Sequence, residues 1–236
     1  MSTDDVRPLT QDDLDWAVEL TRARRARLAP HAPRFWRPAA DAVERHRAFL
    51  SHLIDDAATL TLRSDHGFLV ALHPGPHLMV DDMVVDPVER WATEGVALLR
   101  AATALAPVRF VVPAMESERL DAALDLGLEP AEMWWHRDLE PGTGLNVVSE
   151  DPRLSISGAE AQLVPAPPVH DPGGPVLLIT AVAGADALRD AEQSAARRGA
   201  TVSVVTQRPT DQPLAELLSA AGYALTTYFF VTPPGG

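Results

Sequence analysis

The sequence predicts an α/β fold with a mixed sheet, followed by a second, truncated α/β half. Apolar, β-branched runs such as residues 78–85, 108–112 and 202–206 alternate with stretches of helical periodicity. The order strand, helix, strand, helix, strand also occurs twice, and Gly127 and Gly222 each close the last helix of a copy. This alternation favours helices packed on a sheet that includes parallel strands.

The composition of this 236-residue chain excludes several kinds of chemistry. It has no cysteine, so disulfides and thiolate metal sites are excluded. All 20 basic residues are arginine, so there is no lysine for a Schiff base. The net charge of −13 argues against nucleic acid and anionic membranes as partners. The polar, acidic first residues do not resemble a signal peptide, and we expect a cytoplasmic protein.

The first part of the chain contains the longer copy. Residues 6–9 form a predicted strand, and Thr10 with Asp13 makes a capping box for a helix that reaches about residue 27. A second helix is predicted over residues 40–54. The strands that follow are predicted at 59–63, 68–72, 78–85, 108–112 and 132–139, with helices at 96–106 and 117–126 between the last three.

The second part is shorter. Residues 141–174 are rich in proline and glycine and read as a linker with one short strand at 154–156. Strands at 176–179, 201–206 and 223–231 and helices at 185–198 and 214–221 follow. We therefore divide the chain into domains at 1–140 and 175–236. The second is too small for a core of its own, so we expect it to pack on the first domain or on a second chain.

The step from the strand at 78–85 into the next helix carries a recognisable motif. It consists of Val85, Pro87, Arg90, Gly95, Leu98 and Leu99. Their spacing resembles that of the cofactor loop in the GNAT acetyltransferase superfamily, with Trp91 and Thr93 in place of two glycines of the family pattern. The resemblance covers about residues 6–139, and the later segment resembles a degenerate half of a second GNAT fold.

This resemblance implies acetyl-CoA as co-substrate. The pantetheine arm would bond to the backbone of Met83, Val84 and Val85, where a bulge splays two central strands. The diphosphate would lie on the loop and helix start, where free amides and the helix dipole favour an anion. Those positions are Arg90, Trp91, Ala92, Thr93, Gly95 and Val96. The second copy lacks this loop and carries Asp186 there.

Three carboxylates are the candidate catalytic bases. Asp81 and Asp82 are adjacent on a strand and so point to opposite faces, which lets one face the cleft. Glu116 follows the next strand. Such a base needs a raised pKa to act near neutrality. The alternative is that Asp81 and Asp82 only solvate the strand or pair with arginine. Ala123 stands where many members of the family carry a tyrosine that acts as the general acid.

An arginine-rich segment is the candidate acceptor site. Residues 22–47 hold eight arginines against two acidic residues. Arg27 and Arg34 could recognise a carboxylate or phosphate on the acceptor, because the guanidinium fork matches these groups. Phe35 and Trp36 could form an apolar wall. The alternatives are a solvated helix face for the arginines and an anchor for a proline-rich loop for the two aromatic residues.

Two function classes remain open. The first is an acetyl-CoA-dependent N-acetyltransferase that acts on a small amine-bearing acceptor, with an anionic acceptor as one version. The second is a non-catalytic GNAT-fold protein that binds CoA or serves as an interaction module. A small-molecule acceptor is the expected partner, a homodimer is an open alternative, and no metal site is expected.

Overall fold

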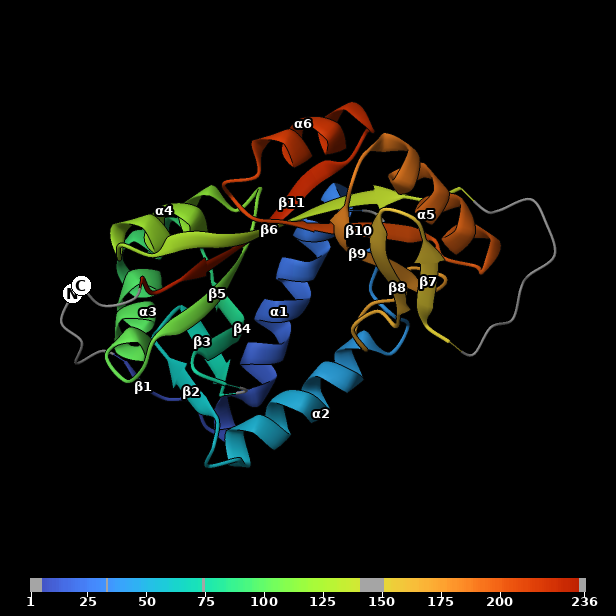
Figure 1. Ribbon diagram of the computed structural model, residues 1–236. Coiled ribbons are helices and arrows are strands. Elements are labelled where there is room, and N and C mark those ends of the chain that lie inside the picture. Colours follow the sequence, from blue (N-terminus) through green and yellow to red (C-terminus); the bar gives the residue numbers. More distant parts are fainter. Residues whose placement is uncertain (1–5, 33, 74, 141–150, 234–236) are drawn as a thin grey trace. The chain divides into compact units, whose positions relative to one another are not determined.

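The computed structural model describes residues 6–32, 34–73, 75–140 and 151–233. The chain forms two compact units that do not follow the sequence in order (Figure 1). Unit 1 contains Met1–Arg27, Val43–Ala131 and Tyr228–Gly236, and unit 2 contains Leu28–Ala42 and Glu132–Thr227. Among the described residues, no helix has both the length and the apolar character needed to cross a membrane.

Unit 1 is built on a mixed sheet in the order β1-β2-β3-β4-β5. The pairs β1/β2, β2/β3 and β3/β4 are antiparallel, whereas β4 and β5 are parallel. The sequence predicted all five. Their bounds are β1 Arg7–Pro8, β2 Leu60–Arg63, β3 Gly67–Leu72, β4 Leu78–Val85 and β5 Val108–Pro113.

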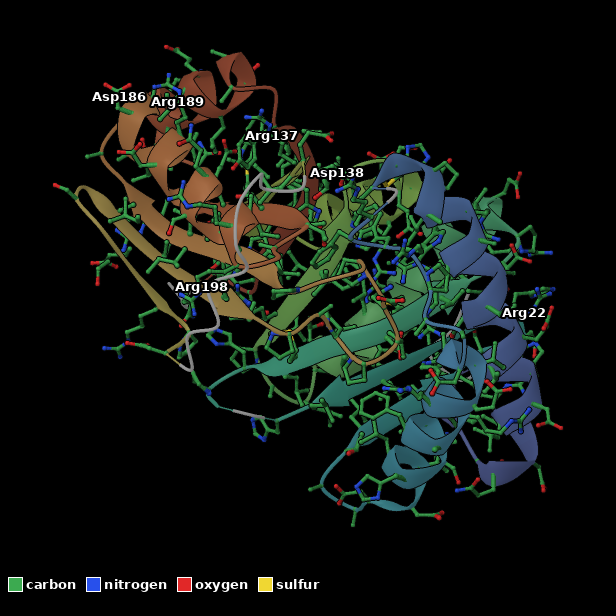
Figure 2. The ribbon with its side chains drawn as sticks, turned by 90° about the vertical axis from the view of Figure 1, so that its right-hand side faces the viewer. Arg22, Arg137, Asp138, Asp186, Arg189 and Arg198 are labelled. Carbon is green, nitrogen blue, oxygen red and sulfur yellow. The ribbon has the colours of Figure 1, made fainter. Side chains whose placement is uncertain are left out.

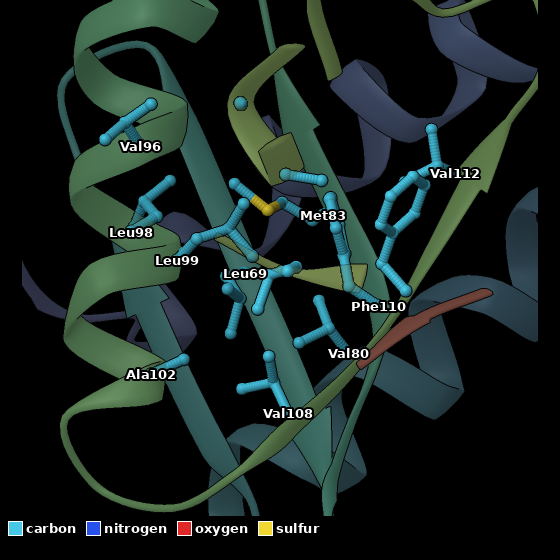
Figure 3. Close-up of a cluster of buried hydrophobic side chains, with 14 of the residues drawn as sticks. Leu69, Val80, Met83, Val96, Leu98, Leu99, Ala102, Val108, Phe110 and Val112 are labelled. Carbon is cyan, nitrogen blue, oxygen red and sulfur yellow. The ribbon is translucent and has the colours of Figure 1, made fainter. Parts of the chain in front are cut away.

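Two pairs of helices cover opposite faces of this sheet. Helices α1 (Leu14–Leu28) and α2 (Ala42–Asp55) pack on Phe68, Val70 and Val84. Helices α3 (Val96–Thr103) and α4 (Ser117–Asp125) pack on the alternate side chains of the same strands, and Figure 3 shows the α3 side of this core. The two cores account for the predicted periodicities, because successive strand residues point to opposite faces.

The predicted capping box at the start of α1 is present. The Asp13 carboxylate accepts hydrogen bonds from the backbone amide and the hydroxyl of Thr10, both at 3.0 Å. Asp13 also binds Arg7 and Arg63, so one buried carboxylate joins β1, β2 and the start of the helical segment.

A β-bulge interrupts β4 at Asp81. Val70 of β3 lies opposite Asp82, whereas Ala71 lies opposite Val80, so Asp81 is the extra residue. In the described residues, the paired register of β4 with β5 covers Leu78–Val80 only. We call the unpaired region beyond it, residues 82–85 of β4 and 111–113 of β5, the β4–β5 wedge.

Unit 2 repeats the succession strand, helix, strand, helix that runs from β4 to α4 in unit 1. Its sheet runs β6-β10-β9-β8-β7, with β9 and β10 parallel and the other neighbours antiparallel. The prediction missed β8, which lies in the segment read as a linker. The bounds are β6 Glu129–Asp138, β7 Arg153–Ile156, β8 Ala159–Val164, β9 Val176–Val182, α5 Ala185–Arg197, β10 Val202–Gln207 and α6 Gln212–Ala220.

The two copies exchange their final strands. Strand β6 follows α4 in sequence, yet most of it pairs with β10 in unit 2. Strand β11 (Ala224–Val231) ends in unit 1, where Phe230 joins the core under α3. The Thr232 amide donates to the Val108 carbonyl, and the Val108 amide donates to the Thr232 hydroxyl, both at 3.0 Å. Each unit is therefore completed by residues from the other copy.

Candidate functional site

The segment expected to bind a diphosphate is helical instead of an open loop. Residues Val88–Arg90 form a 3₁₀ turn, and Trp91–Gly95 form a π-helical turn that continues into α3. The Trp91 indole is buried in the core, 6.5 Å from the Phe110 ring. A Cβ at Gly95 would collide with this indole. Gly95 thus makes room for a tryptophan side chain in the core.

The other predicted diphosphate residues divide between surface and core. Arg90, Ala92 and Thr93 are exposed, whereas Val96 is buried. Glu94, which the sequence did not single out, is buried and accepts hydrogen bonds from the amide and Nδ1 of His66, both at 2.7 Å. Burial raises the pKa of Glu94, but hydrogen bonds from Ser64 and His66 lower it by more, so the net pKa lies below its ordinary value.

Arg119 occupies the β4–β5 wedge. Its side chain comes from α4 and is only 1% exposed. Nη1 donates to the Met83 carbonyl at 2.6 Å, and Nε donates to the Val111 carbonyl at 2.9 Å. The guanidinium also lies 4.5 Å from the centre of the Phe110 ring. One side chain therefore bridges the two strands where they no longer pair with each other.

Further charged side chains surround Arg119. Arg24 binds both carboxylate oxygens of Glu116 through Nε and Nη2, at 2.8 Å each, and Glu116 lies 3.7 Å from Arg119 Nη1. Asp82 accepts a hydrogen bond from His46 Nε2 at 2.7 Å. We call these five residues, Arg24, His46, Asp82, Glu116 and Arg119, the charge cluster. It contains two of the three predicted catalytic carboxylates.

Neither of these carboxylates has the raised pKa that a general base requires. Burial raises the pKa of Asp82, but the hydrogen bond and charge of His46 and the nearby arginines lower it to about 2. For Glu116, burial is outweighed by Arg24, and the net pKa is again lowered. For Asp81 only the backbone is described, as the bulge residue. The catalytic roles of all three stay predictions.

Arg119 lies in the part of the β4–β5 wedge where the resemblance places the pantetheine arm. The Asp86 amide bonds to the His66 carbonyl of β3, so Met83 and Val85 direct their backbone groups toward β5. Arg119 already occupies the Met83 carbonyl there and fills the gap to Val111. The side chains of Met83, Val84 and Val85 are buried in the two cores.

The predicted acceptor-binding residues belong to different units. Arg27 lies in unit 1, with Nη1 3.4 Å from Asp86. Arg34, Phe35 and Trp36 lie in unit 2. Arg34 donates to the Leu139 carbonyl at 2.5 Å.

The two aromatic residues anchor the Leu28–Ala42 segment. The ring of Phe35 lies 4.2 Å from the ring of His136, and Trp36 lies 6.1 Å from it. Both are more than nine-tenths buried. This matches the anchoring alternative for Phe35 and Trp36. Burial also lowers the pKa of His136 to about 3, so its imidazole is neutral at physiological pH.

Sequence reasoning did not single out three members of the charge cluster: Arg24, which it counted only among the eight arginines of residues 22–47, His46 and Arg119. Arg119 lies three and four residues before buried Ala122 and Ala123, and His46 lies four residues before buried Leu50. A charged or titratable residue in an apolar helical stripe was the available signal, because such residues are buried only with partners. The buried Nδ1 of His46 has no hydrogen-bond partner in the described part of the chain.

The start of α5 in unit 2 has no counterpart of the phosphate loop. Only Ala183 and Gly184 separate β9 from α5. Asp186 lies in the first turn and pairs with Arg189 at 2.7 Å (Figure 2). A carboxylate at this position opposes a phosphate electrostatically.

Comparison with known proteins identifies the fold. No family model and no curated protein matches the sequence. A protein from Thermoplasma acidophilum described as an acetyltransferase has a similar structure, with a TM-score of 0.57 at 12% identity over 96% of this chain and 97% of that one. A GCN5-related N-acetyltransferase from Sphaerobacter thermophilus gives 0.51 at 12% identity, with 96% and 94% covered. The fold is therefore that of the GNAT acetyltransferases.

Proposed function

We propose that this chain, which has the GNAT fold, is a non-catalytic binding protein that does not take up acetyl-CoA in unit 1. One observation carries the proposal: Arg119 fills the wedge in which the cofactor arm would lie and bonds to both of its strands. The buried Trp91 and the lowered pKa values of Asp82 and Glu116 support it.

The competing function is an acetyl-CoA-dependent N-acetyltransferase acting on a small amine-bearing acceptor. The fold favours it, and His46 adds an imidazole beside Asp82. This function requires Arg119 to leave the wedge and its two carbonyl partners. It also requires the exposed Arg90 to bind the diphosphate without the glycines of the family pattern.

Calorimetric titration of the intact protein with acetyl-CoA separates the two functions. We expect no saturable binding up to about 1 mM, the upper end of ordinary KM values. Replacing Arg119 by methionine, which keeps much of the volume without the charge, should open the wedge and create measurable affinity. Arg100→Met, at an exposed position on α3, is the matched control and should behave like the wild type.

Saturable binding of acetyl-CoA by the wild type would contradict the proposal and support the enzyme. In that case Arg90→Ala should weaken the affinity by about 1–3 kcal/mol, the size of a charge-assisted contact. Assays of thiol release with a panel of amines and amino acids would then identify the acceptor.

A further inference from the structure

Among the described residues of unit 2, helices pack on one face only of the outer strands. Leu154, Ile179 and Leu188 are part of the core that β7, β8 and β9 share with α5. In unit 1 the opposite face of the equivalent strands is covered by α1 and α2. The described residues of unit 2 contain no counterpart of these two helices. On this second face β7 carries Arg153 and Ser155 and β8 carries Glu160, Gln162 and Val164, whereas unit 1 has Phe68 and Val70 there.

A hollow of about 380 Å³ lies on these outer strands. The strand register places Arg153 of β7 directly opposite Gln162 of β8. Glu160 lies two residues away from Gln162 and so on the same face. Thr180 lies at a register shift in β9, and its hydroxyl donates to Glu160 Oε2 at 3.4 Å. A bulge of this kind redirects a side chain relative to a regular strand.

The opposite charges in this hollow are not paired with each other. No carboxylate within the described residues lies in ion-pairing distance of the Arg153 guanidinium, and Glu160 has Thr180 as its hydrogen-bond donor. Arg153 and Glu160 are diagonal neighbours across two strands, a relation that separates Cβ atoms by about 7–8 Å. A small molecule with both charges could bridge such a pair.

We propose that this hollow binds a small zwitterion of the α-amino acid type. Its carboxylate binds the guanidinium of Arg153 in the two-pronged geometry that arginine favours. Its ammonium group binds Glu160, which Thr180 orients. The Gln162 amide supplies a neutral donor and acceptor beside the two charges. The hollow is large enough for an amino acid with its side chain.

This inference does not depend on the state of the wedge in unit 1. It names a ligand class for a binding protein, and amino-acid titrations report on it separately from acetyl-CoA titrations. Amino-acid binding without acetyl-CoA binding fits both proposals. Acetyl-CoA binding without amino-acid binding contradicts both.

The test is a thermal-shift screen of the intact protein against the standard L-amino acids, followed by calorimetry. We expect saturable binding of at least one amino acid. Its N-acetyl derivative, which lacks the ammonium charge, and its carboxamide, which lacks the carboxylate, should each bind at least about 10-fold more weakly. Absence of saturable binding by every amino acid overturns the proposal, and so does equal affinity for the derivatives.

Matched variants locate the site. Arg153→Gln should remove the preference for the free carboxylate, and Glu160→Gln should remove the preference for the free ammonium. Each should weaken binding about 10-fold or more. Both positions are exposed, so we expect the fold to tolerate them. Arg189→Gln, at an exposed position on α5, should leave affinity unchanged. Binding that both hollow variants retain would place the ligand elsewhere and overturn the assignment.

Discussion

Arg119 shows how a buried guanidinium can replace strand pairing. Burial lowers its pKa to about 9, yet it remains a cation at neutral pH. Two backbone carbonyls, Glu116 and the Phe110 ring together compensate the lost hydration. Removing it leaves the Met83 and Val111 carbonyls without this donor, so the closed wedge depends on a single side chain.

The pair of Asp82 and His46 should stabilise the fold in a pH-dependent way. The pKa of Asp82 in the folded chain is about 2, below the value of about 3.9 for an unfolded aspartate. Its contribution is therefore fully present above about pH 4 and is lost as the pH falls toward 2. We expect Asp82→Asn to cost about 2 kcal/mol at pH 7 and much less near pH 2.

Urea unfolding of wild type and variant between pH 2 and 7 measures this difference. The comparison is needed because the pKa of Asp13 is also lowered, so the wild type alone does not isolate Asp82. Asp121→Asn, at an exposed position on α4, is the control and should change stability by less than about 0.5 kcal/mol. A constant difference across the pH range would show that Asp82 acts by packing and not by charge.

Sequence reasoning identified some residues of the charge cluster but not the residues that pair with them. It selected Asp82 and Glu116, because carboxylates beside buried strands stand out. It offered arginine as a possible partner of Asp82 without naming a residue, since Arg24 and His46 come from helices that are distant in sequence. It assigned Phe35 and Trp36 two possible roles, and only their contacts with His136 distinguish a loop anchor from an open wall.

At the scale of elements, the helical turn at Trp91–Gly95 should behave as part of the core. Trp91→Gly restores a glycine of the family pattern but removes a buried indole, and we expect a loss of about 3–5 kcal/mol. It should not create acetyl-CoA affinity, because Arg119 remains in the wedge. Chemical unfolding and calorimetry measure the two effects.

Thr93→Gly is the matched control, since it restores the other glycine of the pattern at an exposed position. Its cost should stay below about 1 kcal/mol, the difference in helix propensity. Equal stability of the two variants would mean that the indole contributes nothing to the core, and binding of acetyl-CoA by Trp91→Gly would mean that the turn alone blocks the cofactor.

Helices and strands were predictable where apolar side chains recur with the period of a helix or a strand. Strands rich in valine, such as Val108–Pro113 and Val202–Gln207, were found close to their observed bounds. Strand β8 was missed because Ala159–Val164 has one β-branched residue and is followed directly by a proline-rich stretch. The π-helical turn was not predicted, and its residue Trp91 packs on residues remote in sequence, such as Phe110.

At the scale of the whole chain, the exchanged strands should make unit 1 depend on the C-terminus. Phe230 is buried in the core of unit 1, so we expect Phe230→Ala to cost about 3–5 kcal/mol. Hydrogen exchange should then accelerate at the amides of β5, which belong to the same unit. Leu105→Ala, at a position 67% exposed, is the control and should leave exchange unchanged.

Ending the chain after Thr227 is the stronger form of this test. It removes Tyr228–Gly236 from unit 1 and leaves the residues of unit 2 in place. We expect loss of protection in β5 and retained protection in β10. Protection retained in β5 would show that unit 1 folds without the exchanged strand, and that the C-terminal segment is an appendage.

The exchange of strands also determines when, during synthesis, the sheet of unit 1 can be completed. A ribosome that has just added Ala131 has made most of unit 1, but the strand that completes it follows only about 100 residues later. At elongation rates of about 5–20 residues per second, that interval is roughly 5–20 s. Throughout it, the edge of β5 at Val108 lacks its partner at Thr232. The nascent chain therefore carries an open sheet edge, a known aggregation risk, until Thr232 emerges.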